Sequence, residues 1–68
     1  MIKTKIVNVK EQIIEDSIRL FVDKGYKATT IKDITDAVNI TKGAFYWHFK
    51  SKDELLDTII DLYEAYLT

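Results

Sequence analysis

Apolar residues recur three and four positions apart along most of the chain, which is the spacing of amphipathic helices. The first predicted helix spans residues 10–24. Its inward face consists of Ile13, Ile14, Ser17, Leu20 and Phe21. Gly25 follows and is expected to end the helix as a left-handed C-terminal cap. Because the chain has no proline and only two glycines, the pattern predicts an all-α fold.

Two short helices follow, separated by a tight turn. One is predicted over residues 31–38, with Thr30 and Asp33 in the positions of a capping box and Asn39 in a left-handed turn conformation after it. The other is predicted over residues 42–49, with Thr41 as its N-cap. Two helices joined by so short a turn form a helix-turn-helix unit.

A fourth helix is predicted over residues 51–68, starting at the capping box S-K-D-E. Its apolar residues cover an arc of roughly 160°, wider than a surface helix needs. These residues are Leu55, Leu56, Ile59, Ile60, Leu62, Tyr63, Tyr66 and Leu67. No stop signal precedes Thr68, so the helix is expected to lead into a further part of a longer protein. Alternatively, the two tyrosines and Leu67 cover the core of the first three helices.

Length and composition exclude several classes of protein. A chain of 68 residues is at most one small domain, with little volume for an enclosed active site. Its 47% hydrophobic content argues against disorder. The lack of cysteine excludes disulfides and thiolate metal sites, and neither a signal peptide nor a membrane-spanning run is present. We expect a cytoplasmic protein.

The net charge of −1 conceals an uneven distribution of charge. Residues 39–52 and residues 1–10 each contain three lysines and no acid, whereas residues 53–68 carry a charge of −5 and residues 11–38 carry −2. The positive charge therefore lies on the third predicted helix and on a flexible N-terminal arm over residues 1–9. A basic edge beside an acidic fourth helix is suited to phosphate contacts, which the net charge alone would argue against.

The third predicted helix combines this charge with aromatic side chains. Phe45 and Phe49 lie four residues apart and are expected to point into the core. Tyr46 and Trp47 then fall on other faces, where exposed rings beside lysines suit contact with phosphates and bases. Alternatively, Trp47 packs against the rest of the fold. Gly43 allows the backbone to approach a ligand closely.

The run from Gly25 to Leu55 resembles the N-terminal DNA-binding domain of the TetR family of bacterial transcriptional regulators. Four motifs carry the resemblance: G-Y after the first helix, T-T before the second, K-G-x-F-Y-x-H-F in the third and S-K-x-x-L at the start of the fourth. The resemblance extends upstream to about Lys10. Asp16 departs from it at a position where members commonly carry Ala. Ile40 replaces an often polar turn residue, so no DNA contact is expected from it.

This resemblance implies a three-helix, homeodomain-like helix-turn-helix domain over residues 10–50 and the start of a connector helix over residues 51–68. In such regulators the connector leads to a C-terminal domain that binds a small effector and dimerises. Neither the effector pocket nor the dimer surface would then lie in these 68 residues.

The resemblance also implies which residues contact DNA. The start of the recognition helix, which lies in the major groove and touches bases and phosphates, corresponds to Thr41, Lys42, Gly43 and Ala44. The residues that correspond to phosphate contacts are Thr30, Tyr46, His48 and Lys52. Trp47 corresponds to a variable, often aromatic, contact position. Lys50 is expected to be a solvated charge or, at most, to contribute to phosphate binding at long range. A helix cap alone would also explain Thr30, and an ordinary surface histidine would explain His48.

Two functions are compatible with these observations. The first is a sequence-specific DNA-binding domain of a TetR-like repressor, which binds the double-stranded DNA of a palindromic operator as a homodimer and is released by a small-molecule effector. The alternative is a small helical protein-interaction module, favoured by the acidic and apolar fourth helix. No catalytic residue, cofactor or metal is expected, because the single histidine has no cysteine or second histidine to complete a site.

Overall fold

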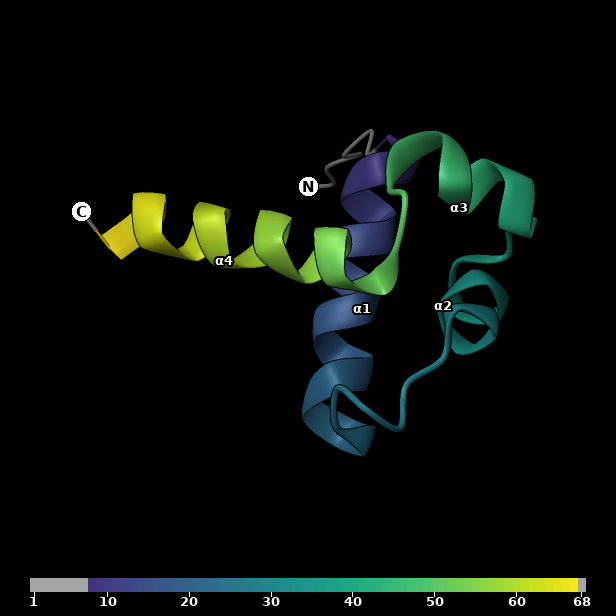
Figure 1. The fold of residues 1–68 in the computed structure, drawn as a ribbon, viewed down its shortest axis with the longest axis horizontal. Coiled ribbons are helices and arrows are strands. Elements are labelled where there is room, and N and C mark those ends of the chain that lie inside the picture. The colour runs from purple at the N-terminus through teal and green to yellow at the C-terminus, as the bar shows by residue number, and fades with distance from the viewer. Residues whose placement is uncertain (1–7, 68) are drawn as a thin grey trace, which may run out of the picture.

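The computed structural model describes the backbone of residues 8–67 and the side chains of residues 8–65. This part of the chain contains four helices and no strand, so the prediction of an all-α fold is confirmed (Figure 1). The helices are α1 (Val9–Lys24), α2 (Ile31–Val38), α3 (Lys42–His48) and α4 (Lys52–Leu67).

The two ends of α1 differ slightly from the prediction. The helix begins one residue earlier, at Val9, because Asn8 Oδ1 accepts a hydrogen bond from the backbone N–H of Glu11 at 2.8 Å. Gly25 ends the helix with a φ of +93°, positive as expected, but its ψ of 151° lies outside the left-handed helical region. Asn8 and Val9 thus form the N-cap and the first residue of the helix instead of the end of the predicted arm, whose residues 1–7 lie outside the described part of the chain.

The predicted caps of α2 and α3 are confirmed. Thr30 Oγ1 accepts the backbone N–H of Asp33 at 3.0 Å, and Asp33 Oδ2 accepts the backbone N–H of Thr30 at 2.9 Å. Asn39 adopts the left-handed conformation, with φ 68° and ψ 49°. Thr41 Oγ1 accepts the backbone N–H of Ala44 at 3.1 Å. The helix α3 ends at His48, one residue earlier than predicted.

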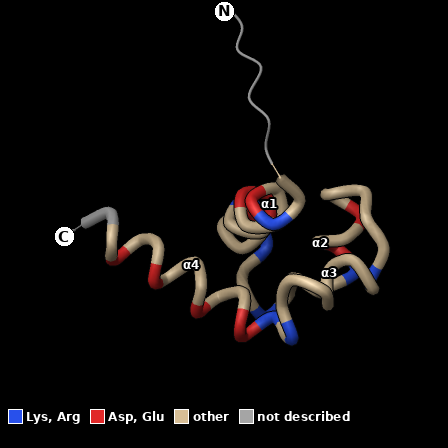
Figure 2. Tube along the Cα trace, turned by 90° about the horizontal axis from the view of Figure 1, so that it is seen from above, with Lys and Arg blue, Asp and Glu red and all other residues tan. Residues whose placement is uncertain are grey.

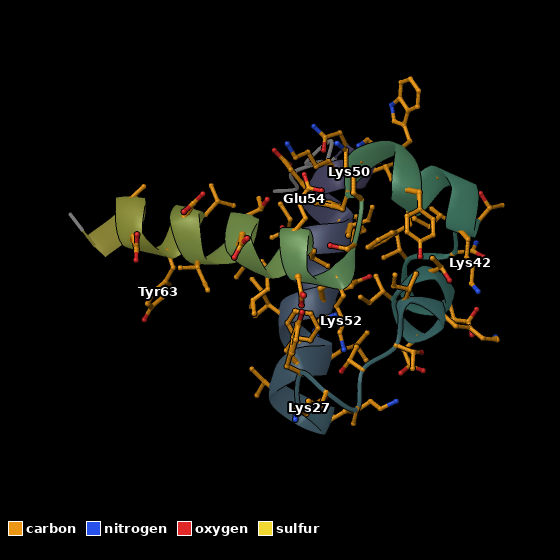
Figure 3. The ribbon with its side chains drawn as sticks, in the orientation of Figure 1. Lys27, Lys42, Lys50, Lys52, Glu54 and Tyr63 are labelled. Carbon is orange, nitrogen blue, oxygen red and sulfur yellow. The ribbon has the colours of Figure 1, made fainter. Side chains whose placement is uncertain are left out.

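The capping box predicted for α4 is only half formed. Ser51 Oγ accepts the backbone N–H of Glu54 at 3.0 Å, as expected. The carboxylate of Glu54, however, accepts the backbone N–H of Lys50 at 2.9 Å instead of that of Ser51. Lys50 and Ser51 form a bend before the helix. The backbone N–H within reach of the Glu54 carboxylate is therefore that of Lys50, one residue before the N-cap Ser51 (Figure 3).

The core is small and takes side chains from all four helices and from Phe49, which follows α3. Five hydrophobic side chains are at most 2% exposed: Ile13, Ile34, Phe45, Phe49 and Leu55. Phe45 and Phe49 point inward as predicted, with their ring centroids 5.9 Å apart. A helix of seven residues is not stable by itself in water, so these two rings hold α3 in place.

Only the first half of α4 packs on this core, and the helix extends away from the other three (Figure 1). Leu55 is buried, whereas Leu62 and Tyr63 are 53% and 63% exposed. Tyr63 therefore does not cover the three-helix core, while the side chains of Tyr66 and Leu67 lie outside the described part. No helix in the described range is long and apolar enough to cross a membrane.

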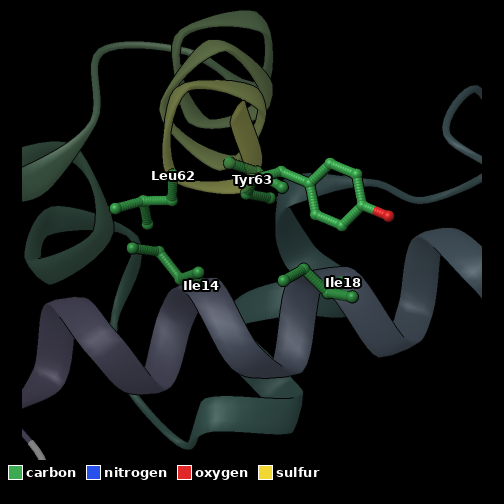
Figure 4. A pocket seen from close by; sticks show the side chains of 5 residues that line it. Ile14, Ile18, Leu62 and Tyr63 are labelled. Carbon is green, nitrogen blue, oxygen red and sulfur yellow. The ribbon is translucent and has the colours of Figure 1, made fainter. Parts of the chain in front are cut away.

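Between α1 and α4 lies an apolar groove of about 220 Å³ (Figure 4). It is lined by Ile14, Ile18, Ile59, Leu62 and Tyr63. Three of the lining residues, Ile59, Leu62 and Tyr63, belong to the wide apolar arc of α4 noted in the sequence.

Truncating a buried and an exposed side chain of α3 should lower the stability of the domain by very different amounts. Phe45→Ala removes a fully buried ring and should lower the free energy of unfolding by about 3–5 kcal/mol. That loss is comparable with the total stability of a domain of this size, about 3–10 kcal/mol. Trp47 is 83% exposed, so Trp47→Ala should change stability by less than about 0.5 kcal/mol. Urea unfolding followed by circular dichroism measures both, and similar losses for the two variants would contradict the described packing.

Candidate nucleic-acid interface

Apart from the buried Phe45 and two half-buried residues, α3 is open to solvent. The outer face of α3 consists of Lys42, Gly43, Tyr46 and Trp47, all of which are exposed. Tyr46 is 48% exposed, and its ring stands edge-on to Phe45 at a centroid distance of 5.4 Å. Trp47 is 83% exposed, so the alternative in which it packs against the fold is wrong.

Gly43 has no structural requirement within this fold. Its φ is not positive, and a Cβ added there would meet only Thr41 Oγ1, at 3.8 Å, an ordinary van der Waals contact. A glycine inside a helix is about 0.8–1.0 kcal/mol less favourable than alanine. The absence of a side chain at this position of the outer face is therefore better explained by something that must approach the backbone closely.

The positive charges of the described chain divide into paired and unpaired ones, and two of the unpaired ones lie at the ends of α3 (Figure 3). Three cations of the described chain form ion pairs within α1 and α2: Arg19 with Asp16 at 3.0 Å, Lys24 with Asp33 at 2.7 Å and Lys32 with Asp36 at 2.8 Å.

By contrast, Lys27, Lys42 and Lys50 form no ion pair with any described residue. Figure 3 shows Lys42 and Lys50 at opposite ends of α3 and Lys27 in the loop between α1 and α2. The acids of the C-terminal part run along α4, away from α3 (Figure 2). For the described residues, the basic part around α3 and the acidic α4 are thus separated in three dimensions, whereas the lysines at positions 3 and 5 lie outside the described part.

Lys52 has a structural role that the sequence did not indicate. Its Nζ donates hydrogen bonds to the backbone carbonyls of Tyr26 at 2.6 Å and Thr29 at 2.8 Å. The same ammonium lies 4.2 Å from the centroid of the Tyr26 ring, in a cation–π contact. Two of its three N–H donors are therefore engaged within the chain, and one remains for a phosphate.

Further contacts hold the loop between α1 and α2, to which Lys52 is hydrogen-bonded. The Tyr26 hydroxyl donates a hydrogen bond to Asp53 of α4. The buried Thr29 hydroxyl lies 2.8 Å from the carbonyl oxygen of Gly25 and 3.3 Å from that of Leu20. Removal from water, together with the Asp53 carboxylate, raises the pKa of Tyr26 to about 12, so the phenol stays a neutral donor at physiological pH. Sequence reasoning missed the roles of Tyr26, Thr29 and Asp53, although the G-Y motif contains Tyr26 and the T-T motif contains Thr29.

Thr30, at the start of α2, directly follows the residue whose carbonyl Lys52 holds. Its hydroxyl oxygen is the cap acceptor described above, while the hydroxyl proton is still available to an outside acceptor. The Lys24 ammonium, and after it the Thr30 N–H, lower the pKa of Asp33 to about 2, so the cap is fully charged near neutral pH. A cap role and a phosphate role for Thr30 are compatible.

The predicted site residues thus fall into two groups. Those on or at the start of α3 are Thr41, Lys42, Gly43, Ala44, Tyr46, Trp47 and His48. Ala44 and His48 are half-buried at the flank of the outer face, and the His48 ring lies 6.5 Å from that of Phe49. Thr30 and Lys52 form the second group, beside the loop between α1 and α2. Ile40 packs against the core, in agreement with the expectation that it makes no DNA contact.

Comparison with known proteins identifies the family. Residues 13–59 match the family model described as bacterial regulatory proteins of the tetR family. The chain belongs to the TetR family. The TetR-family match spans α2, α3 and most of α1, together with the first half of α4, and so includes every predicted site residue.

Individual relatives agree with this assignment. The uncharacterized HTH-type transcriptional regulator YerO of Bacillus subtilis is 56% identical over 54 residues, which are 79% of this chain and 19% of YerO. The probable acrEF/envCD operon repressor of Escherichia coli is 40% identical over 55 residues, 81% of this chain and 25% of the repressor. A crystal structure of a transcriptional regulator of the TerR/AcrR family from Aquifex aeolicus is 50% identical, with a TM-score of 0.78 over 79% of this chain and 32% of that protein. The chain therefore spans about a fifth to a third of the length of these relatives.

The role of Lys52 in holding the loop predicts a stability effect in this TetR-family chain. Lys52→Met keeps the aliphatic stem but leaves the carbonyls of Tyr26 and Thr29 without their charged donor, which should lower the free energy of unfolding by about 1–3 kcal/mol. Lys50→Met, on the exposed residue two positions earlier, is the matched control and should change it by less than about 0.5 kcal/mol. Urea unfolding measures the free energy of unfolding of both variants. Equal losses of stability would contradict a stabilising role for the hydrogen bonds of Lys52.

Proposed function

We propose that this chain is the sequence-specific DNA-binding part of a TetR-family transcriptional repressor and that α3 is its recognition helix. The observation that carries the proposal is the outer face of α3, which combines an unpaired lysine, two exposed aromatic rings and a glycine that the fold does not need. A major groove about 12 Å wide admits a single helix. The names of relatives support the proposal, since two of them are the probable acrEF/envCD operon repressor of Escherichia coli and the negative transcriptional regulator IcaR of Staphylococcus epidermidis.

Within this proposal the residues divide their roles. The start of the helix contacts bases and nearby phosphates, through Thr41, Lys42, Gly43 and Ala44. The groove walls are contacted by Thr30, Tyr46, Trp47 and His48. Lys52 is a positioning residue that holds the loop before α2 and directs its remaining N–H to a phosphate. Phosphate contacts fix the orientation of the helix, and base contacts supply the sequence preference.

The rest of the proposed function concerns a longer protein. In it, α4 connects this domain to a C-terminal domain that binds a small effector and forms a homodimer on a palindromic operator in the cytoplasm. The exposed apolar residues of the second half of α4 support a connector role. We propose no catalytic activity and no cofactor for this chain. Among its described residues, no group of three or more His, Cys, Asp or Glu side chains is placed to hold a metal ion.

The groove between α1 and α4 favours a second candidate function, protein–protein interaction through these two helices. Its lining is apolar and includes Ile18 and Leu62, which are 42% and 53% exposed. This candidate uses the face that carries Tyr63, whereas the first uses the outer face of α3. Binding to DNA separates the two candidates.

Salt dependence is the direct test of the proposed function. If Lys27, Lys50 and Lys52 neutralise three phosphates, the logarithm of the affinity should fall with the logarithm of the salt concentration with a slope of about −2.7, or about 40-fold for a fourfold rise in salt. Lys27→Met should make that slope less steep by about one. Fluorescence anisotropy with a mixed-sequence duplex measures both. A chain that ignores DNA even at low salt would favour the protein-interaction candidate.

Gly43 predicts a variant that is more stable but binds more weakly. Gly43→Ala should raise the free energy of unfolding by about 0.5–1 kcal/mol, because alanine is the better helix former. The added methyl group should hold the helix away from DNA and weaken binding at least about tenfold, since the same surface must approach the bases. Thr58→Ala on α4 also raises helix propensity and is the control that should leave affinity unchanged. Unchanged affinity of Gly43→Ala would show that no close approach occurs there.

A further inference from the structure

The side chains that usually read bases are scarce in this chain. Arginine on guanine and asparagine or glutamine on adenine form the paired hydrogen bonds of direct readout. The whole sequence contains one arginine, one glutamine and two asparagines, none of them within α3. The readout of any base by α3 must therefore use other chemistry.

Three of these four side chains are also engaged on α1. Arg19 is paired with Asp16 at 3.0 Å, and Gln12 donates to the same carboxylate at 3.1 Å. Asn8 accepts a hydrogen bond as the N-cap of α1. Only Asn39, in the left-handed turn before α3, lies near the recognition helix.

The start of α3, which we propose to contact bases, has few chemical groups that could distinguish one base pair from another. Lys42 supplies a single ammonium that no described acid pairs with. Gly43 offers only its α-carbon, and Ala44 a half-buried methyl group. Thr41 Oγ1 accepts the backbone N–H of Ala44 at 3.1 Å as the N-cap of the helix, which leaves its hydroxyl proton free to donate. One point charge, one hydroxyl donor and a small apolar surface are what remains to distinguish base pairs.

The ammonium and the apolar surface each have one natural counterpart on the major-groove edge, whereas a threonine hydroxyl can pair with several base edges. The C5 methyl group of thymine is the apolar group there, and small side chains such as alanine contact it. The adjacent O6 and N7 acceptors of guanine suit a lysine ammonium. Gly43 lets the thymine methyl group approach the helix backbone, and Ala44 can then cover it from the flank.

We propose that α3 recognises its DNA site through thymine methyl groups packed against Gly43 and Ala44 and through one guanine bound by Lys42, and not through paired hydrogen bonds from an amide or a guanidinium. This inference rests on the proposed function and specifies the base chemistry that the same surface selects.

The test starts from duplexes that the 68-residue chain enriches from a random pool at low salt. In the enriched duplex, each thymine is replaced in turn by deoxyuridine, which removes only the methyl group. At one or two positions affinity should fall about fourfold per buried methyl group. Replacing one guanine by 7-deazaguanine should weaken the wild-type chain by a similar factor but have no effect on Lys42→Met, which lacks the ammonium.

Two protein variants sharpen the test. With Ala44→Gly, the deoxyuridine effect should shrink towards unity, because the methyl group has lost its partner. If Ala44→Gly folds poorly, the effect of deoxyuridine on the affinity of the wild-type chain still tests the methyl readout. Asn39→Gly keeps the left-handed backbone and should leave the enriched sequence unchanged.

The outcomes separate this inference from the function on which it rests. No enrichment of any sequence would contradict the proposed sequence-specific function. Enrichment with no deoxyuridine effect at any position, or a changed preference of Asn39→Gly, would overturn the methyl readout while leaving DNA binding intact.

Discussion

The burial of Phe45 and Phe49 is the constraint on which the rest of the structure depends. The seven-residue α3 has too few backbone hydrogen bonds to be stable alone, so its position is set by these two rings in a core of five fully buried hydrophobic side chains. The same geometry decides what α3 presents to solvent. Because the phenylalanines face inward, Gly43 and Trp47 must face outward, and the interface exists as the reverse side of the core.

A second set of contacts fixes the segment before α2. The Lys52 ammonium and the Asp53 carboxylate, both in the first turn of α4, hold the loop between α1 and α2 through Tyr26 and Thr29. The start of α2 therefore depends on where α4 begins. This dependence links the helix that extends away from the body to the pair of helices that carries the proposed DNA contacts.

The sequence predicted the features that depend on neighbouring residues and missed those that join distant ones. The caps at Thr30 and Thr41 each involve residues three positions apart, so the spacing alone was sufficient. The contact of Lys52 with Tyr26 joins residues 26 positions apart, and periodicity carries no information about such a pair. The Glu54 carboxylate accepts the backbone N–H of Lys50 instead of that of Ser51 because of a bend in the chain, and the sequence pattern does not predict this bend.

The candidate site was predicted in a similar way. The exposure of Tyr46 and Trp47 followed from the burial of Phe45, because neighbouring residues on a helix point in different directions. The half-burial of Ala44 and the engagement of Lys52 depend on packing between helices, which the sequence alone does not reveal. The DNA contacts themselves were implied by the family resemblance and stay predictions.

The central claim is that the outer face of α3 meets DNA, and the single tryptophan reports on it directly. Trp47 is the one tryptophan in the sequence and is 83% exposed, so acrylamide should quench its fluorescence efficiently in the free chain. Addition of duplex DNA at low salt should protect Trp47 from quenching, and raising the salt should remove the protection. Quenching that stays unchanged while anisotropy shows the DNA to be bound would contradict the claim.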